Sequence, residues 1–236
     1  MSLDKALYQQ IREDAEVKEF EINGRKYTSK SLVALPDPQP EPLQVSTLTG
    51  LIDYLNFAKE LKGKEVFCHI ETPTRVYVRT HLHGTFCQRS TFIKAIANIP
   101  NIPFNDFVNI NRFIIILQSN FIDNSDRADL LRYVGNIRSS EIKTVSDDGV
   151  SQEITTKTGT ATVANVILPN PVTLRPYRTF NEIEQLESTF ICRGQKDGDT
   201  PKFALFEADN GAWQLEAMES IKKYLQNQIP ELCVIA

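Results

Sequence analysis

Prolines occupy every second position from 36 to 42, in the segment Pro36-Asp-Pro-Gln-Pro-Glu-Pro42. Proline lacks an amide hydrogen and fixes φ, so this segment cannot continue a helix or form a central strand. Such a composition is typical of a stiff, extended connector, although proline-rich segments also serve as peptide-recognition motifs. We therefore expect an N-terminal arm at 1–35, a linker at 36–45 and a main domain at 46–236.

The arm shows the patterns of a helix followed by a hairpin. Apolar residues recur at helical spacing between residues 2 and 18, which predicts an amphipathic helix. Asn23 and Gly24 then separate two short segments, 19–22 and 25–32. Because a tight two-residue turn needs positive φ at both positions, this pair predicts a β-hairpin.

The main domain mixes helical and strand patterns without a regular β-α-β order. This favours an α+β fold with a mixed, mainly antiparallel sheet and flanking helices. The continuous apolar run at 113–117 favours a strand buried on both faces. The helices are expected at 47–58, 89–98, 125–137 and from 211 onward, and the other strands at 65–70, 75–82, 160–168, 172–180, 188–193 and 202–207. Ser46 or Thr47 is expected to cap the first of these helices, and the buried side of the last is expected to carry Leu215, Met218, Ile221 and Leu225.

Residues 139–158 differ from the rest of the domain in being mostly hydrophilic. Their alternation around Asp148-Gly149 predicts a protruding β-hairpin. A polar two-stranded ribbon buries little apolar surface and is marginally stable in water. We expect it either to lie on the main domain or to contact another subunit.

Charge and cysteine usage narrow the classes of function. The 236 residues include 26 basic and 30 acidic ones, for a net charge of −4. This argues against a protein that coats DNA indiscriminately, but it leaves room for a local basic patch. The dispersed cysteines suggest buried thiols in a reducing compartment, and neither a signal segment nor a long apolar run is apparent. We therefore expect a cytoplasmic protein with no membrane partner.

The three histidines cluster in one stretch and form a candidate metal site. His69, His81 and His83 lie within residues 68–87, together with Cys68 and Cys87. A hairpin turning at 72–74 places His69 opposite Tyr77, with His81 on the same face. Zinc needs three or four converging donors, but the spacing matches no known zinc pattern. The alternative is an ordinary polar sheet face formed by His69, Tyr77, Arg79 and His81, and no cofactor is expected.

Two groups of acids offer weaker candidates for catalysis. Glu141-Ile142-Lys143 follows several aspartates, as in some metal-dependent nucleases. The aspartates also fit helix capping and the first turn of a helix. A second acidic group could hold a catalytic pair, but nothing marks its geometry and a run of charges is usually a solvated face. The aspartates are Asp123, Asp126 and Asp129, and the second group is Glu182, Glu184, Glu187, Glu207 and Asp209.

Arginines interleaved with aromatic residues form a candidate nucleic-acid site. Arg175, Tyr177 and Arg178 lie close together, and Arg193 on the next expected strand could join them. Such residues pair with phosphates and stack on bases. Alternatively, the aromatic rings are packed and the arginines pair with Glu182 or Glu184.

Several segments near both ends of the chain carry a resemblance to a known family. They are Asn23-Gly-Arg-Lys-Tyr27, Ser46-Thr-Leu-Thr-Gly-Leu-Ile-Asp-Tyr-Leu55, Leu174-Arg-Pro-Tyr-Arg-Thr-Phe180, Glu184-Gln-Leu-Glu-Ser188, Phe190-Ile-Cys-Arg193 and Glu207-Ala-Asp-Asn-Gly-Ala-Trp213. These segments resemble a phage and prophage family typified by YfdQ, while the middle of the chain is similar only in the order of its elements. The resemblance implies a phage origin, but the family carries no assigned activity or catalytic residues.

These observations favour a non-catalytic phage or prophage accessory protein. We expect it to act as a homo-oligomer, such as a ring or shell, or by binding a partner. One alternative is nucleic-acid binding in phage replication or recombination through Arg175, Tyr177, Arg178 and Arg193. Another alternative is a metal-dependent hydrolase that uses His69, His81 and His83.

Overall fold

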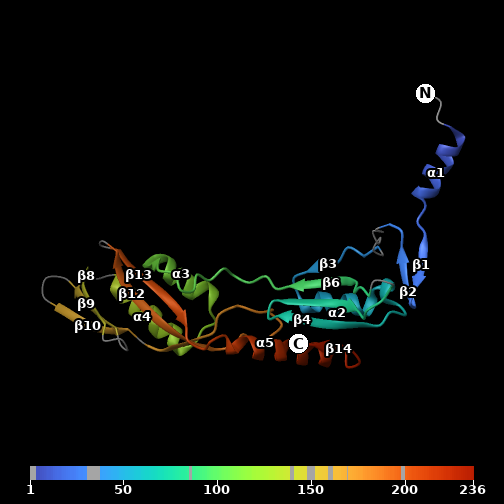
Figure 1. Cartoon of the computed structure of the whole chain (residues 1–236). Coiled ribbons are helices and arrows are strands. Elements are labelled where there is room, and N and C mark those ends of the chain that lie inside the picture. Colours follow the sequence, from blue (N-terminus) through green and yellow to red (C-terminus); the bar gives the residue numbers. More distant parts are fainter. Residues whose placement is uncertain are drawn as a thin grey trace. The chain divides into compact units, whose positions relative to one another are not determined.

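The computed structural model describes residues 4–30, 38–84, 87–138, 141–147, 152–158, 162–168, 170–197 and 200–236. The chain divides into two compact units, Met1–Pro38 and Gln39–Ala236 (Figure 1). The division lies inside the proline segment. Helices flank sheets that are mainly antiparallel, so the predicted α+β fold is confirmed.

The smaller unit contains one helix and one hairpin. Helix α1 (Lys5–Ala15) is followed by strands β1 (Glu19–Ile22) and β2 (Arg25–Thr28), which pair antiparallel. Asn23 and Gly24 have φ values of 53° and 74°, in the left-handed region that the tight turn requires. The predicted helix and hairpin are therefore confirmed.

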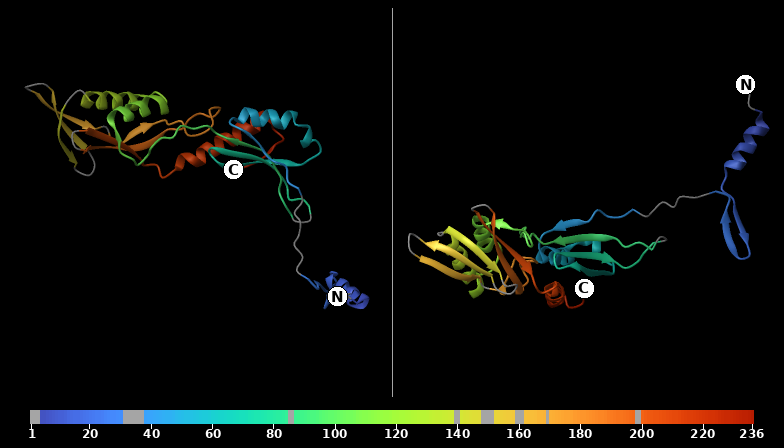
Figure 2. Two further views of the ribbon diagram at one scale, coloured as in Figure 1. Left: turned by 90° about the horizontal axis from the view of Figure 1, so that it is seen from above. Right: turned by 60° about the vertical axis from the view of Figure 1, so that its left-hand side comes forward.

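The larger unit contains two hydrophobic cores, and the first lies against a five-stranded sheet. The strand order is β14-β4-β5-β6-β3, in which β4, β5 and β6 are antiparallel and both edge strands pair in parallel. The left view of Figure 2 shows α2 and α5 beside these strands. The elements are β3 (Leu43–Val45), α2 (Leu48–Phe57), a short 3-10 helix (Lys59–Leu61), β4 (Val66–Thr72), β5 (Arg75–Thr80), β6 (Thr91–Ile96), α5 (Ala212–Gln228) and β14 (Cys233–Ile235).

Helices α2 and α5 cover one face of this sheet. Cys68, Val78 and Ile93 on the strands share a single buried cluster with Leu51 of α2 and Ile221 of α5. Both helices therefore lie on the same side. Side chains alternate between the two faces of a strand, so the residues between these core positions lie on the opposite face.

The second core lies between a four-stranded antiparallel sheet and two helices. The sheet order is β11-β12-β13-β7. Large aromatic rings fill the core, including Phe113, Phe121, Phe190 and Phe203. The elements are β7 (Val108–Asn109), α3 (Ile110–Asn120), α4 (Ser125–Arg138), β11 (Val172–Leu174), β12 (Ser188–Asp197) and β13 (Thr200–Glu207).

Two predicted elements have the opposite secondary structure. The apolar run at 113–117 is part of helix α3, where Phe113, Ile116 and Leu117 are buried and Ile115 is exposed. A short apolar run fits a strand and a buried helix equally well, and here the Asn109 side chain caps the helix by accepting from Arg112 N at 2.9 Å. The predicted helix at 89–98 is strand β6, because its β-branched residues complete the sheet beside β5.

Two smaller expectations also change. The predicted strand at 172–180 ends at Leu174, because the following Arg175-Pro176 segment leaves the sheet. In the last helix Leu215 is exposed, and Ala217 lies in the core beside Ile221 and Leu225. The predicted cap of α2 is confirmed, since Thr47 Oγ1 accepts from Gly50 N at 3.1 Å.

The hydrophilic ribbon has three strands rather than two. Strands β8 (Glu141–Asp147), β9 (Gln152–Thr158) and β10 (Thr162–Leu168) form an antiparallel sheet in the order β10-β9-β8. The predicted hairpin pairing of β8 with β9 is confirmed, while its turn at Asp148-Gly149 lies outside the described residues. Helix α4 lies against both β8 and β10, so the ribbon contacts its own subunit.

Candidate functional site

The three histidines occupy one region but make separate contacts. His69 lies opposite Tyr77 in the β4–β5 pairing, as predicted, and accepts a hydrogen bond at Nδ1 from Arg79 Nη1 at 3.0 Å. The ring of His81 packs on that of Phe67, with centroids 5.2 Å apart. His83 Nε2 lies 2.8 Å from Ser90 Oγ.

This arrangement gives the predicted metal site no support. Within the described ranges, no three His, Cys, Asp or Glu side chains form a group that could hold a metal ion. Arg79 bonds Nδ1 of His69, the His81 ring packs on Phe67, and Nε2 of His83 bonds Ser90, so each histidine has its own partner. A site at His69, His81 and His83 therefore stays a prediction.

A pocket of about 400 Å³ lies where β4 begins and β5 ends. Its floor is formed by the buried residues Thr80, Ser90 and Phe92, and its rim by exposed side chains that include His81 and His83. A volume of this size is within the range of small-molecule sites. The remaining lining residues are Lys64, Glu65 and Leu82.

The sheet face opposite the helices carries aromatic and basic side chains that touch one another. The guanidinium of Arg79 lies over the Tyr77 ring at 4.4 Å, and that of Arg89 lies over the Phe67 ring at 5.3 Å. Lys94 on β6 is the register partner of Tyr77. We define the basic-aromatic face by six residues, which are Phe67, His69, Tyr77, Arg79, Arg89 and Lys94.

Sequence reasoning found only half of this face. It placed His69, Tyr77 and Arg79 on one polar sheet face, and the structure agrees. It missed Arg89 and Lys94 because it assigned residues 89–98 to a helix. A signal for a strand was present in this segment, because Phe92 and Lys94 alternate with Ile93 and Ala95. A period of two residues indicates a strand and places Phe92 and Lys94 on the same face.

The arginines of the predicted nucleic-acid site are bound within the chain. Arg175 pairs with Glu184 at 3.5 Å and Glu187 at 3.3 Å, so the alternative of pairing with Glu184 is confirmed. Arg178 is buried, whereas Tyr177 is exposed. Arg193 is half-buried in β12. These side chains therefore do not form a shared open surface.

Arg178 is the centre of a buried polar cluster. Its Nη1 donates to Glu207 Oε1 at 2.8 Å, its Nη2 donates to Ser188 Oγ, and its guanidinium lies 3.9 Å from the centre of the Trp213 ring. Ser188 Oγ in turn donates to Asp209 Oδ2. Burial lowers the pKa of Arg178 to about 10, which still leaves it charged at neutral pH.

The acids predicted as a catalytic group thus have structural partners. Glu207 and Asp209 belong to the Arg178 cluster, while Glu184 and Glu187 pair with Arg175. Glu182 Oε1 accepts from the backbone N of Thr49 at 3.1 Å. The last contact joins the segment after β11 to helix α2.

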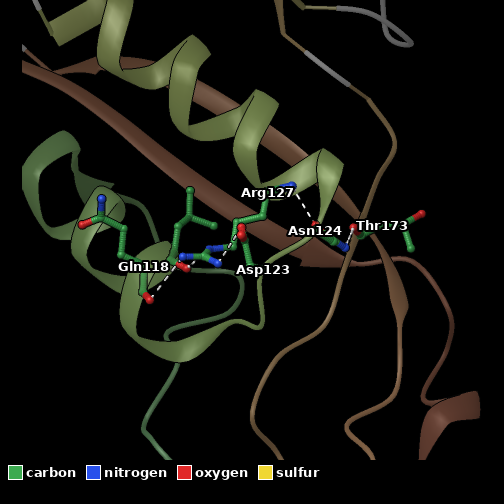
Figure 3. Close-up of polar contacts among 6 residues, drawn as sticks. Gln118, Asp123, Asn124, Arg127 and Thr173 are labelled. Carbon is green, nitrogen blue, oxygen red and sulfur yellow. Dashed lines mark hydrogen bonds and ion pairs between the residues drawn. The ribbon is translucent and has the colours of Figure 1, made fainter.

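The aspartates of the nuclease-like pattern stabilise the corner between α3 and α4. Arg127 donates to Asp123 Oδ1 at 3.0 Å and to the carbonyl oxygens of Leu117 and Gln118 near the end of α3. Figure 3 shows the contacts with Asp123 and Gln118. Asn124 caps α4 by accepting from Arg127 N at 2.8 Å, and its Nδ2 donates to Thr173 O.

The other two aspartates also have partners within the chain. Asp126 accepts from Thr173 N at 2.8 Å, and Asp129 pairs with Arg132 at 2.7 Å. The backbone of Glu141-Ile142-Lys143 lies in β8, but its side chains lie outside the described part of the structure. None of the three aspartates caps α4, because Asn124 does so. Asp126 lies in the first turn of α4, as the alternative predicted, while Asp123 and Asp129 pair with arginines.

The four cysteines are all free thiols, and two of them match the expected burial. Cys68 and Cys192 are buried, whereas Cys87 and Cys233 are exposed. Burial raises the pKa of the Cys68 thiol to about 12, and it also raises the pKa of Cys192. Both buried thiols are therefore protonated near neutral pH.

This difference predicts how a thiol reagent reacts with the folded protein. At about pH 8, Ellman's reagent is expected to modify Cys87 and Cys233 rapidly, because both side chains are exposed to the reagent. Cys68 and Cys192 are expected to react only after unfolding in urea. Rapid modification of either buried thiol in the native protein, located by peptide mass spectrometry, would contradict this assignment.

No helix in the described ranges is long and apolar enough to cross a membrane. Comparisons with protein families, with curated proteins and with solved structures find no match. The resemblance to the phage and prophage family typified by YfdQ therefore stays a prediction.

Proposed function

We propose that this protein is a non-catalytic accessory protein that acts by self-association through its N-terminal unit. Support comes from the exposure of that unit, in which every side chain described between residues 4 and 30 is exposed. A helix and a hairpin that bury none of their own apolar side chains need another surface to be stable. A phage or prophage origin remains part of the proposal and rests on the resemblance alone.

The hairpin of this unit has one apolar and one charged face. Phe20 is paired with Tyr27, and Ile22 is two residues along the same strand, so the three side chains share a face. They are 49%, 47% and 57% exposed. The opposite face carries Glu21 paired with Lys26. The hairpin is therefore amphipathic, and between residues 4 and 30 no described side chain covers its apolar face.

Helix α1 of the same unit also has exposed apolar side chains. Leu7 and Ile11 are four residues apart, so they lie on one side of the helix, and they are 49% and 54% exposed. Contiguous apolar surface rimmed by charges marks interaction sites in proteins.

A second copy of the chain is the occupant that we propose for this surface. Two identical hairpins related by a two-fold axis would cover the same apolar side chains on each other, as in an isologous interface. The proline segment would keep the arms at a high local concentration once a first contact forms. The outcome is a closed homo-oligomer, of which a ring or a shell is one form.

Light scattering coupled to size-exclusion chromatography tests the proposal on the full chain. We expect an oligomer at micromolar concentration. Replacing Phe20, Ile22 and Tyr27 together with serine should weaken association by more than about tenfold, because each buried apolar side chain contributes about 1.5–3 kcal/mol. Circular dichroism should show that the larger unit keeps its fold, since its cores lie elsewhere in the chain.

The charged face of the same hairpin provides the matched control. Replacing Glu19, Glu21 and Lys26 with serine changes an equal number of exposed side chains on the same two strands. This variant should associate like the wild type. A monomeric wild-type protein at micromolar concentration, or equal dissociation of the two triple variants, would reject the proposal.

A further inference from the structure

We infer that the basic-aromatic face binds single-stranded nucleic acid. This inference concerns a surface on the larger unit and does not depend on self-association of the arm. It is also separate from the segment around Arg175 and Arg178, whose arginines are bound to carboxylates of the chain.

The first support is that this face lacks the helices that cover the other side of its sheet. Both α2 and α5 share a core with Cys68, Val78 and Ile93. His69, Tyr77 and Lys94 point away from that core and are partly exposed. A sheet with one face buried and one face accessible provides a flat platform of the kind on which unpaired bases stack.

The second support is the stacking of a ring and a cation on β5 and their contacts with the His69 ring on β4. Tyr77 lies against the Arg79 guanidinium at 4.4 Å, and the His69 ring is 6.4 Å from the Tyr77 ring. Aromatic and guanidinium planes stack on bases of any sequence, while the charges attract the phosphates that follow. The hydrogen bond from Arg79 to His69 fixes these planes before a ligand arrives.

The third support is the local charge. Arg75, Arg79, Arg89 and Lys94 lie on or beside the face, whereas the whole chain has a net charge of −4. The nearby carboxylate of Glu71 accepts from Tyr77 Oη at 3.1 Å and lies 3.8 Å from Arg75. Because the average surface repels polyanions, a cluster of cations on one sheet is a specific attraction.

The pocket at the end of the face fits the same ligand. It has a volume of about 400 Å³, and Lys64 Nζ lies 4.6 Å from the centre of the Phe92 ring on its floor. His81 and His83 on its rim carry ring nitrogens that can bond the edges of a base. We therefore assign the pocket to an unstacked base at one end of the bound strand.

Fluorescence anisotropy with a labelled oligothymidine of about 20 nucleotides tests the inference, with the full chain at low salt. We expect saturable binding that weakens as salt is raised. Replacing both Arg75 and Lys94 with glutamine should weaken binding about tenfold and reduce the salt slope by about 1.4, because each phosphate contact to a single strand contributes about 0.7 to the slope. Replacing Tyr77 with leucine should also weaken binding about tenfold but leave the slope unchanged, because stacking is uncharged.

The matched control is Lys222→Gln with Lys223→Gln on α5, which removes the same charge from the opposite side of the sheet. This variant should bind oligothymidine like the wild type. A duplex of the same length should bind more weakly, because its bases cannot reach the rings. The serine variant of Phe20, Ile22 and Tyr27 should still bind, so failure of this inference is distinguishable from failure of the assembly proposal.

Three results would overturn the inference. One is no saturable binding of oligothymidine or oligouridine at low salt. Another is equal weakening by the Arg75/Lys94 and the Lys222/Lys223 variants, which would indicate a general charge effect. The third is a Tyr77 variant that no longer oligomerises but binds nucleic acid like the wild type. This result would assign the face to a second copy of the chain.

Discussion

Replacing Arg178 with methionine is expected to lower the free energy of unfolding by about 3 kcal/mol, even though methionine is similar in length and apolar. The change removes the partner of Glu207 and of Ser188 together with the cation that lies over the Trp213 ring. Removing one member of a buried charged pair is costly because the other member keeps its desolvation. Glu207 is one-third exposed, which places the expected loss at the lower end of the usual range.

The position of the Arg178 cluster in the fold also explains why its loss should lower the stability of the protein. Arg178 lies between the two cores of the larger unit, because Glu207 ends β13 and Trp213 lies in the first turn of α5. The neighbouring Thr179 donates from Oγ1 to Pro73 O at 2.6 Å, which ties the same segment to the turn between β4 and β5. The Arg178 side chain therefore stabilises the junction of two sheets as well as one ion pair.

Arg175→Met is the matched control for this prediction. Arg175 is in the same segment and also pairs with two carboxylates, but its partners Glu184 and Glu187 are well exposed. Exposed ion pairs contribute less than about 1 kcal/mol. Urea unfolding followed by circular dichroism compares the two variants. Equal losses for Arg175→Met and Arg178→Met would show that burial does not set the contribution of Arg178.

The sequence predicted elements well where local chemistry determines them. The turn at Asn23-Gly24 needs two residues that tolerate positive φ, and the cap at Thr47 needs a side-chain oxygen before a helix. Both signals involve neighbouring residues only. The pairing of His69 with Tyr77 was also predictable, because the short turn at 72–74 fixes the register of β4 and β5.

Elements that depend on tertiary contacts were less predictable. The run at 113–117 becomes helical because Asn109 caps it and because Arg127, from the next helix, donates to the carbonyl oxygens at its end. Residues 91–96 become a strand because β5 and β3 lie on either side. The pairing with β3 and β5 cannot be read from residues 91–96 alone. The Asn109 cap, by contrast, is a local signal directly before the helix, so at 113–117 only the contact from Arg127 depends on tertiary structure.

The candidate site shows the same limit. The sequence indicated which residues carry useful chemistry, but not which of them would already be bound within the chain. Arg175 and Arg178 have the composition of a phosphate site, yet their carboxylate partners come from later segments. Lys94 and Arg89 fall in a segment that was predicted to be a helix. In the structure Lys94 lies beside Tyr77, and Arg89 lies over the Phe67 ring. Pairing across the sheet decides which cations remain accessible to a ligand.

Replacing Phe190 with alanine is expected to produce the largest loss of stability, about 3–5 kcal/mol. Phe190 is fully buried, and its ring stacks on Phe104 with centroids 5.3 Å apart and an interplanar angle of 15°. It also meets the edge of Phe121 at 6.3 Å. Alanine would leave a cavity with aromatic walls, which the β12 backbone cannot collapse to fill because both neighbouring strands hold it.

Phe57→Ala is the control for this prediction. It removes the same ring from α2, where the ring is 79% exposed, and should change stability by less than about 0.5 kcal/mol.

Trp213, the only tryptophan of the chain, reports on the junction beside Arg178, while circular dichroism reports on all helices and strands. If the two cores unfold as one cooperative unit, Phe190→Ala will shift the urea transition equally by both probes. If the circular dichroism transition splits while the tryptophan signal keeps its wild-type midpoint, the two cores unfold separately and the Arg178 cluster does not couple them. A loss below about 1 kcal/mol by both probes would contradict the packing of Phe190 itself, because so small an effect is incompatible with a fully buried aromatic ring.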